Sequence, residues 1–254
     1  MNVSDLTPIE RVGDVYVKRD DKFIIFNSRG GKARSALQLI QNGIEEGYNT
    51  FVTAGSRLSP QCEIVSDICE NMGLSCHLFM PRGNKTTVIE HIELNKSSTI
   101  HRTKVGYNNV ITKWAMDYAS ENNYCYIPFG MECVDNIMIT QHQVANVPLA
   151  ITRIVVPIGS GMSFISICNG LELYQRYDVK VVGVSVGKNP QKNIAKYLNA
   201  PNIKYDIVSV KDNYHHPANN CTIGEIELDE IYEAKCLPYL KEGDLLWIVG
   251  KRIT

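Results

Sequence analysis

The chain has 254 residues, enough for one large domain or two smaller ones with a substantial buried core. Its 26 basic and 27 acidic residues give a net charge of -1, so no whole-chain field would hold a polyanion, although a local basic patch is not excluded. Apolar runs fall well short of the roughly 20 residues that cross a bilayer, and the first residues lack a signal-peptide pattern. We therefore expect a cytoplasmic protein with no membrane partner.

Short β-branched runs alternate along the chain with longer amphipathic stretches. This pattern predicts an α/β protein with mostly parallel sheets. The predicted strands are 14–19, 49–54, 75–80, 98–102, 124–128, 153–157, 179–186, 203–210 and 244–249. The predicted helices are 33–46, 61–72, 86–94, 108–121, 162–177 and 229–240. Because ligands of open α/β sheets bind at the carboxyl ends of strands, the turns after these strands are the places to look for chemistry.

Lys32 stands directly after the pair Gly30-Gly31 and before the first predicted helix. A lysine amine is a nucleophile when it is partly neutral, which burial or a neighbouring cation such as Arg34 favours. A lysine beside bare glycine backbone is therefore a candidate for a Schiff base. The alternative is an ordinary solvated surface lysine.

A glycine-rich turn links the predicted strand 153–157 to the predicted helix 162–177. It is formed by Gly159, Ser160, Gly161, Met162 and Ser163. Inward-pointing amides, the helix N-terminus and the two serine hydroxyls suit a phosphate group, and the alternative is a tight turn with no ligand. The turn lacks the ending of a Walker loop and the third glycine of a dinucleotide loop. Pyridoxal phosphate would need both this turn and a reactive lysine.

The cysteines and histidines give no sign of a metal. The eight cysteines include no Cys-x-x-Cys pair, so we interpret them as reduced thiols that behave as small hydrophobes. His215 and His216 are adjacent, but a third ligand at a helpful spacing is missing. We predict no metal site.

Several stretches resemble one family in its own order: VYVKRDDKF, GGKAR, VTAGSRLSPQCEIVSDICENMGLSCHLFMP, VVPIGSGMSFISICNGLE and LDEIYEAKC. They are similar to the aminocyclopropane-carboxylate deaminase and D-cysteine desulfhydrase group of fold type II pyridoxal phosphate enzymes. The resemblance implies a two-domain tryptophan synthase β-like fold with mostly parallel sheets and pyridoxal 5'-phosphate in the interdomain cleft. It implies a larger cofactor domain of residues 1–35 and 128–254, a smaller inserted domain of residues 36–127, and a homodimer.

The resemblance also implies roles for individual residues. Lys32 would form the internal aldimine, a Schiff base, and then move the α-proton. Glu233 would face the pyridine nitrogen and keep it protonated, and Tyr232 would lie beside the reacting carbons. The remaining roles are a phosphate cup formed by Gly159, Ser160, Gly161, Met162 and Ser163, and a turn with Ser59 and Gln61 that faces the ring and the substrate carboxylate.

Each of these residues has a simpler alternative. Tyr232 would be a core residue and Glu233 a solvated charge in a plain helix. Ser59 would only cap a helix that has Pro60 at its first position.

The chain departs from the family pattern at several positions. Pro60 replaces an asparagine whose amide binds the ring oxygen of the cofactor. Asn219 and Asn220 stand where the family has a tyrosine-glycine segment, which puts deamination of a cyclopropane in doubt. The chain ends soon after GDLLWIVG, where relatives continue, so we expect one side of the site to be open or reshaped. Lys85 lies in a Gly-Asn-Lys-Thr segment that imitates the family signature, and we interpret it as a surface residue.

These observations predict a lyase-type, deaminase-like enzyme of amino acid metabolism that acts at the α-carbon of a small amino acid substrate. A second hypothesis keeps the cofactor but attaches the amino acid to a larger molecule, such as a modified nucleobase or carrier; a nucleic acid would be a partner only in this sense. A third is a binding homologue without catalysis. Pro60 supports this third hypothesis, whereas the retention of Lys32, Tyr232 and Glu233 opposes it.

Overall fold

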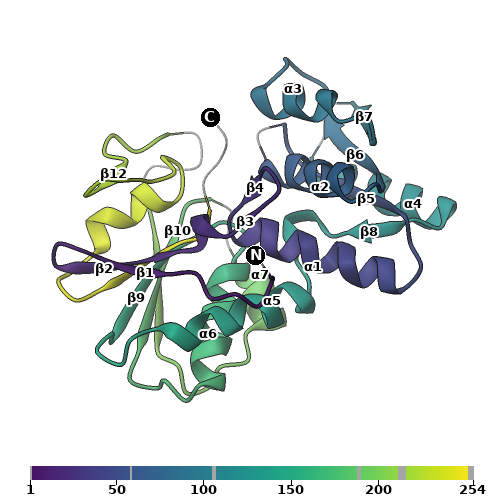
Figure 1. Ribbon diagram of the computed structural model, residues 1–254. Coiled ribbons are helices and arrows are strands. Elements are labelled where there is room, and N and C mark those ends of the chain that lie inside the picture. The colour runs from purple at the N-terminus through teal and green to yellow at the C-terminus, as the bar shows by residue number, and fades with distance from the viewer. Residues whose placement is uncertain (1, 58, 105–106, 188–189, 211–215, 251–254) are drawn as a thin grey trace. The chain divides into compact units, whose positions relative to one another are not determined.

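The computed structural model describes residues 2–57, 59–104, 107–187, 190–210 and 216–250, and their contacts divide the chain into two units. Unit 1 is Ile24–Cys133, and unit 2 is Asn2–Phe23 together with the described chain from Val134 onward. The colour scale of Figure 1 follows the chain through both. Within the described residues, no helix is long and apolar enough to cross a membrane.

Unit 1 is built on a parallel sheet of four described strands in the order β7-β6-β5-β8. Its elements are β3 (Ile24–Ile25), β4 (Ser28–Arg29), α1 (Gly31–Glu45), β5 (Thr50–Ala54), α2 (Pro60–Asn71), β6 (Ser75–Pro81), α3 (Thr87–Leu94), β7 (Ser98–Thr103), α4 (Asn108–Asn122), β8 (Cys125–Ile127) and the 3-10 turn η2 (Phe129–Met131). Alternate residues of β5 face opposite sides of the sheet. Val52 and Ala54 pack against α4, whereas Phe51 meets Gly43 of α1 on the other side, where α2 also packs.

Unit 2 contains a sheet of six described strands in the order β1-β2-β14-β9-β10-β11, parallel except for the β1–β2 hairpin. Its elements are β1 (Ile9–Val12), β2 (Val15–Arg19), η1 (Asp20–Lys22), α5 (Val134–Gln141), η3 (His142–Asn146), β9 (Arg153–Ile158), α6 (Met162–Leu173), β10 (Lys180–Ser185), α7 (Gln191–Tyr197), β11 (Tyr205–Ser209), β12 (Thr222–Ile223), β13 (Ile226–Glu227), η4 (Glu233–Tyr239) and β14 (Leu245–Ile248).

The core of unit 2 lies on both faces of this sheet. Ile154 and Val156 of β9 pack against α6, whereas Val155, between them, faces the side of η4 and the β12–β13 hairpin. Burial on both faces explains the continuous apolar run of β9, which is typical of a central parallel strand.

The predicted strands and most predicted helices are confirmed, with two corrections. The helix predicted at 229–240 is the 3-10 helix η4, because Pro238 lacks the amide that an α-helical ladder needs. The helix predicted at 162–177 ends at Leu173, and Gln175 has a φ of 56°.

The unit boundaries also differ from the expected domain limits. Unit 1 takes in residues 24–35 and 128–133 in addition to the expected range of 36–127, so Lys32 belongs to unit 1 by its contacts. The reason is local: the β3–β4 hairpin and α1 both pack against α2.

Candidate active site

The glycine-rich turn of unit 2 runs from the end of β9 at Ile158 to the start of α6 at Met162. Gly161 caps α6 with a φ of 94°, a backbone conformation that favours glycine. Asn193 Nδ2 donates to the Ser160 carbonyl at 2.8 Å and fixes the turn from the side of α7. The amides at the start of α6 and the half-buried hydroxyls of Ser160 and Ser163 are the donors from which the sequence predicted an anion site, and this role stays a prediction.

Tyr232 lies directly against this turn. A Cβ added to Gly159 would stand 3.0 Å from Tyr232 Cε1 and 3.3 Å from Tyr232 Oη. Only a glycine allows the ring to approach the backbone so closely, so the tyrosine and the turn, predicted separately, come together in unit 2. Asp229 fixes the backbone of Tyr232, because Asp229 Oδ1 accepts a hydrogen bond from the Tyr232 amide at 3.0 Å.

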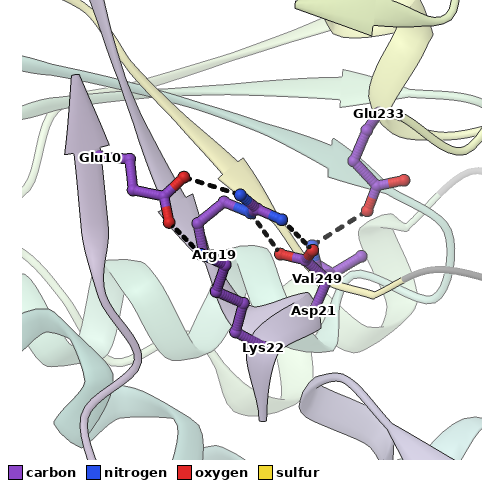
Figure 2. A network of polar contacts seen from close by, with 6 residues as sticks. All are labelled: Glu10, Arg19, Asp21, Lys22, Glu233 and Val249. Carbon is purple, nitrogen blue, oxygen red and sulfur yellow. Dashed lines mark hydrogen bonds and ion pairs between the residues drawn. The ribbon is translucent and has the colours of Figure 1, made fainter. Parts of the chain in front are cut away.

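Glu233 is completely buried, and only one of its carboxyl oxygens has a partner. Oε1 accepts from the Val249 amide at 2.9 Å, whereas Oε2 has no hydrogen bond to any described residue. Figure 2 shows the second oxygen pointing away from Val249 with no dashed line. Burial, and secondarily the charge of Asp229, raises the pKa of Glu233 to about 8. The alternative of a solvated charge is therefore wrong.

The segment Lys18-Arg19-Asp20-Asp21 lies next to Glu233 and is held by hydrogen bonds and ion pairs. In Figure 2 the Arg19 guanidinium bridges Glu10 and Asp21 at 2.7 Å each, and Arg19 pairs in register with Ile248, the residue before Val249. Buried Lys18 donates to the Thr7 carbonyl at 2.8 Å, and buried Asp20 accepts from Trp247 Nε1 at 3.1 Å. This part of the family-like sequence is thus structural.

Lys32 is the second residue of α1 in unit 1, and its side chain is exposed. Its charge acts on the thiol of Cys62 in α2; burial raises the pKa of this thiol, and Lys32 lowers it in part. The Sγ atom of Cys62 lies against Gly55, at the turn after β5. Lys32 is therefore near the end of a parallel strand, where α/β proteins bind ligands.

Asp67 anchors the turn that leads to Lys32. This buried carboxylate of α2 accepts from Ser28 Oγ at 2.8 Å, from the Asn27 amide at 3.0 Å and from Asn27 Nδ2 at 3.0 Å. Sequence reasoning missed Asp67, although an acidic residue within the apolar face of a predicted helix was a signal for a buried polar anchor.

Ser59, in the turn before α2, caps this helix, which is the simpler of the roles considered for it in the sequence. Ser59 Oγ accepts from the Gln61 amide at 3.4 Å, and Pro60 occupies the first position of α2. Gln61 is buried and uses its side chain within unit 1: Nε2 donates to Thr53 Oγ1 and to the Pro128 carbonyl, both at 2.8 Å, and Oε1 accepts from the Gly130 amide at 2.7 Å. These bonds make Gln61 a support of the turn after β8.

Lys85, Asn219 and Asn220, which were also singled out in the sequence, are exposed. Lys85 is exposed and pairs with Glu93 at 2.6 Å, as expected of a surface residue. Asn219 and Asn220 are exposed before β12. His215 lies outside the described residues. Among the described residues no group of histidine, cysteine or acidic side chains has the arrangement of a metal site.

The comparison with known proteins decides the family. Residues 3–229 match the model of the pyridoxal-phosphate dependent enzyme family. The chain belongs to this family. Its cofactor is pyridoxal 5'-phosphate, and its fold is the two-domain, tryptophan synthase β-like α/β fold with parallel sheets that the resemblance implied.

Relatives and solved structures agree with this assignment. A probable 1-aminocyclopropane-1-carboxylate deaminase of Schizosaccharomyces pombe is 25% identical, covering 88% of this chain and 79% of that protein. An O-seryl-dTMP PLP-dependent decarboxylase of Salmonella phage ViI is 24% identical over 72% of this chain, which spans about half (51%) of that protein. The crystal structure of an ACC deaminase homologue superposes with a TM-score of 0.82 at 19% identity, covering 98% of this chain and 90% of that chain.

The described residues of unit 2 fit the cofactor. The unpartnered Oε2 of Glu233 suits a protonated ring nitrogen, whose positive charge would offset the cost of ionising this buried carboxyl, and the turn at Gly159–Gly161 suits a phosphate.

Proposed function

We propose that the chain is a lyase-type enzyme that acts at the α-carbon of an amino acid, with Lys32 and Glu233 serving one pyridoxal phosphate. The observation that carries the proposal is the buried Glu233 oxygen without a partner among the described residues. A buried polar atom without a hydrogen bond costs on the order of 1–3 kcal/mol, so such an atom is a candidate for contact with a ligand.

The residues of unit 2 have separate tasks in this proposal. The amides and hydroxyls of the turn at Gly159–Ser163 bind the phosphate, and Glu233 holds a proton at the ring nitrogen. When bound, the cofactor supplies an electron sink for the negative charge that develops at the α-carbon. Tyr232, whose ring lies against Gly159, orients the substrate carbons and excludes water from them.

Lys32 has the task of covalent attachment and proton transfer. With pyridoxal phosphate bound, Lys32 Nζ would hold the cofactor at its carbonyl carbon, and the free amine would move a proton at the substrate α-carbon. Asp67 supports this role because it fixes the turn before Lys32. Ser59, at the start of α2, is our candidate for contact with the substrate carboxylate. We also propose a homodimer, whose test is the molar mass in solution.

The visible absorbance of purified protein loaded with pyridoxal phosphate tests this function. We expect a band that borohydride treatment abolishes and that Lys32→Ala lacks, because the variant has no amine for the carbonyl carbon. Lys85→Ala is the matched control, since it removes the lysine of the Gly-Asn-Lys-Thr segment that imitates the family signature, and it should keep the band. A wild-type protein that takes up no cofactor would refute the proposal.

A second candidate function has one specific observation in its favour. The name of the phage relative describes a seryl group joined to the nucleotide dTMP, which is an amino acid on a larger carrier. The same residues would then act at the α-carbon of a nucleotide-linked amino acid, with decarboxylation as the reaction. A band shift on adding free amino acids supports the first candidate. If the band does not shift with free amino acids but does shift with a nucleotide-linked amino acid, the second candidate is supported.

A further inference from the structure

The carboxyl-terminal edge of the unit 1 sheet carries basic side chains that the proposed chemistry does not use. We call Arg57, Arg82, Lys85, Arg102 and Lys104 the basic edge. Arg57 follows β5, Arg82 and Lys85 follow β6, and Arg102 and Lys104 are at the end of β7. Because β5, β6 and β7 are parallel neighbours, these side chains meet on one edge of the sheet.

Hydrogen bonds and ion pairs connect the turns that carry the basic edge. Arg57 Nη1 donates to the Asn84 carbonyl at 3.0 Å, which joins the turns after β5 and β6. The Arg82 amide donates to the Thr103 carbonyl at 2.9 Å, which joins the turns after β6 and β7. Glu93 of α3 bridges Lys85 at 2.6 Å and Arg102 at 3.6 Å.

The positive charge of the basic edge exceeds the negative charge beside it. α3 contributes Glu90 and Glu93, and only Glu93 pairs with members of the edge. Arg82 and Lys104 are exposed, and within the described chain no carboxylate forms an ion pair with either. The helices end in acids at the opposite edge of the sheet, at Glu45, Glu70 and Glu121. Although the net charge of the whole chain is -1, unit 1 has basic residues at one edge of its sheet and acidic residues at the opposite edge.

An exposed aromatic side chain follows strand β7 in the chain. Tyr107 precedes the first turn of α4, follows β7 and is 84% exposed. Proteins that bind single-stranded nucleic acids combine cationic grooves with aromatic rings on which bases stack. Three adjacent strands span roughly 10 Å, which is wider than a single phosphate group, so the edge suits successive phosphates of one strand.

The basic edge lies beside the reactive lysine of the same unit. The charge of Lys32 acts on Cys62, and Cys62 Sγ lies against Gly55, two residues before Arg57. A strand bound along the edge would therefore present a group attached to one of its bases to the region of Lys32.

We propose that the basic edge and Tyr107 bind the sugar-phosphate backbone of a DNA strand that carries the amino acid on a modified base. The proposal rests on the second candidate function, in which the substrate is linked to a nucleotide. It assigns to unit 1 a binding surface for the carrier, separate from the groups that hold the cofactor.

Fluorescence anisotropy with a labelled single-stranded DNA tests the surface, with the cofactor-loaded protein titrated at several salt concentrations. The double variant Arg82→Ala/Lys104→Ala removes two exposed cations that form no ion pair with a described carboxylate. We expect it to bind at least about tenfold more weakly, with the slope of log K against log salt reduced by about 0.7 for each lost phosphate contact. Lys96→Ala/Lys180→Ala removes the same charge before β7 and at the start of β10, and should keep the wild-type slope.

Three outcomes would overturn the proposal: no DNA binding by the wild type at low salt, equal weakening in both double variants, or dTMP binding as tightly as the strand, which would assign the edge to a free nucleotide. The visible band of the same samples separates the two proposals. A retained band without DNA binding overturns only the binding surface, and DNA binding without a band overturns only the cofactor chemistry.

Discussion

At the scale of single residues, the chemistry rests on polar groups that the fold buries at a cost. Glu233 has an unpartnered oxygen among the described residues, and the raised pKa of its carboxyl records the penalty for ionising it there. Asp67 is the contrasting case, because its carboxylate accepts hydrogen bonds from the turn before Lys32 and from Asn71. One carboxyl is incomplete without a ligand, and the other is complete and serves as an anchor.

The cofactor-free protein tests the cost of burying Glu233. Its pKa is about 8 in the folded state and 4.5 ordinarily, so the folded state binds more protons and its stability falls as the pH rises between these values. We expect Glu233→Gln to be more stable than wild type by on the order of 2 kcal/mol at pH 8, with a smaller difference at pH 5. Urea unfolding at both pH values measures this. Glu230→Gln, at the exposed neighbouring acid, should show no such trend; a trend shared by both variants would contradict the assignment.

Asp67→Asn tests the anchor of the Lys32 turn. The amide retains one acceptor oxygen but places a donor where the Asn27 amide or Ser28 hydroxyl also donates. We expect a loss of about 1–3 kcal/mol in unfolding free energy, and a weaker visible band at a fixed cofactor concentration. The control is Asp117→Asn, which changes an exposed pair with Lys113 and should cost less than about 0.5 kcal/mol. Full cofactor loading by Asp67→Asn would argue against a positioning role.

At the scale of elements, the close contact between Tyr232 and the turn after β9 makes a specific prediction. A methyl group on Gly159 would press against the tyrosine ring at 3.0 Å, so Gly159→Ala should displace Tyr232 or the turn. We expect a loss of cofactor affinity of roughly tenfold or more, measured by titrating the visible band. Gly187→Ala makes the same change where a Cβ would meet no described residue within 4 Å, and should bind nearly as wild type. If Gly159→Ala and Gly187→Ala bind the cofactor with equal affinity, the contact between Tyr232 and Gly159 does not position the cofactor site.

The sequence predicted elements well where burial imposed a clear period, and less well where local chemistry decided. The central strands β9, β10 and β14 appear as continuous apolar runs because both of their faces are covered. The hairpin strand β1 was missed, although Val12 and Val15 pair across a two-residue Gly-Asp turn that is a recognised hairpin signal. The helix α5 was missed because Val134 and Met138 are exposed, which obscures the apolar period.

The candidate site was predictable to the same extent. Glycine turns and a lysine carry a chemical pattern along the chain, so the Gly159–Gly161 turn and Lys32 could be named in advance, whereas Glu233 was named only from the resemblance to the family. The bond network of Gln61 and the anchoring by Asp67 join residues far apart in sequence, and only the fold reveals such partners.

At the scale of the whole molecule, the two units contain titratable groups, one fully buried and a pair half-buried, that respond to acid in opposite directions. Unit 2 holds Glu233, whose contribution to stability grows as the pH falls. Unit 1 holds a pair of histidines on β6 and β7: His77 Nδ1 and His101 Nε2 are 3.0 Å apart, and Tyr124 and Phe79 stack on their rings. Burial, and for His77 also the charge of His101, lowers the pKa of both imidazoles.

The sign for the histidines follows from linkage. Their pKa values are lowered from 6.5 in the folded state, so the unfolded chain binds more protons and unit 1 loses stability as the pH falls below about 6.5. Glu233 has the opposite sign because its pKa is raised. Acidification from pH 8 to pH 5.5 should therefore weaken the amides around β6 and β7 relative to those around η4 and β14.

Hydrogen exchange of the cofactor-free protein, read peptide by peptide at pH 8 and pH 5.5 after correction for intrinsic rates, measures this opposition. His77→Phe keeps an aromatic ring between Tyr124 and Tyr118 and removes one titrating group. It should therefore protect unit 1 peptides from exchange relative to wild type at pH 5.5. The effect should be less than about 1 kcal/mol, because the rings are partly solvated. Glu233→Gln should protect unit 2 peptides at pH 8 and leave the unit 1 peptides unchanged. His142→Gln, at an exposed histidine of unit 2, is the control for the loss of an imidazole. If His77→Phe and His142→Gln alter unit 1 peptides equally, the histidine pair does not control the acid response of that unit.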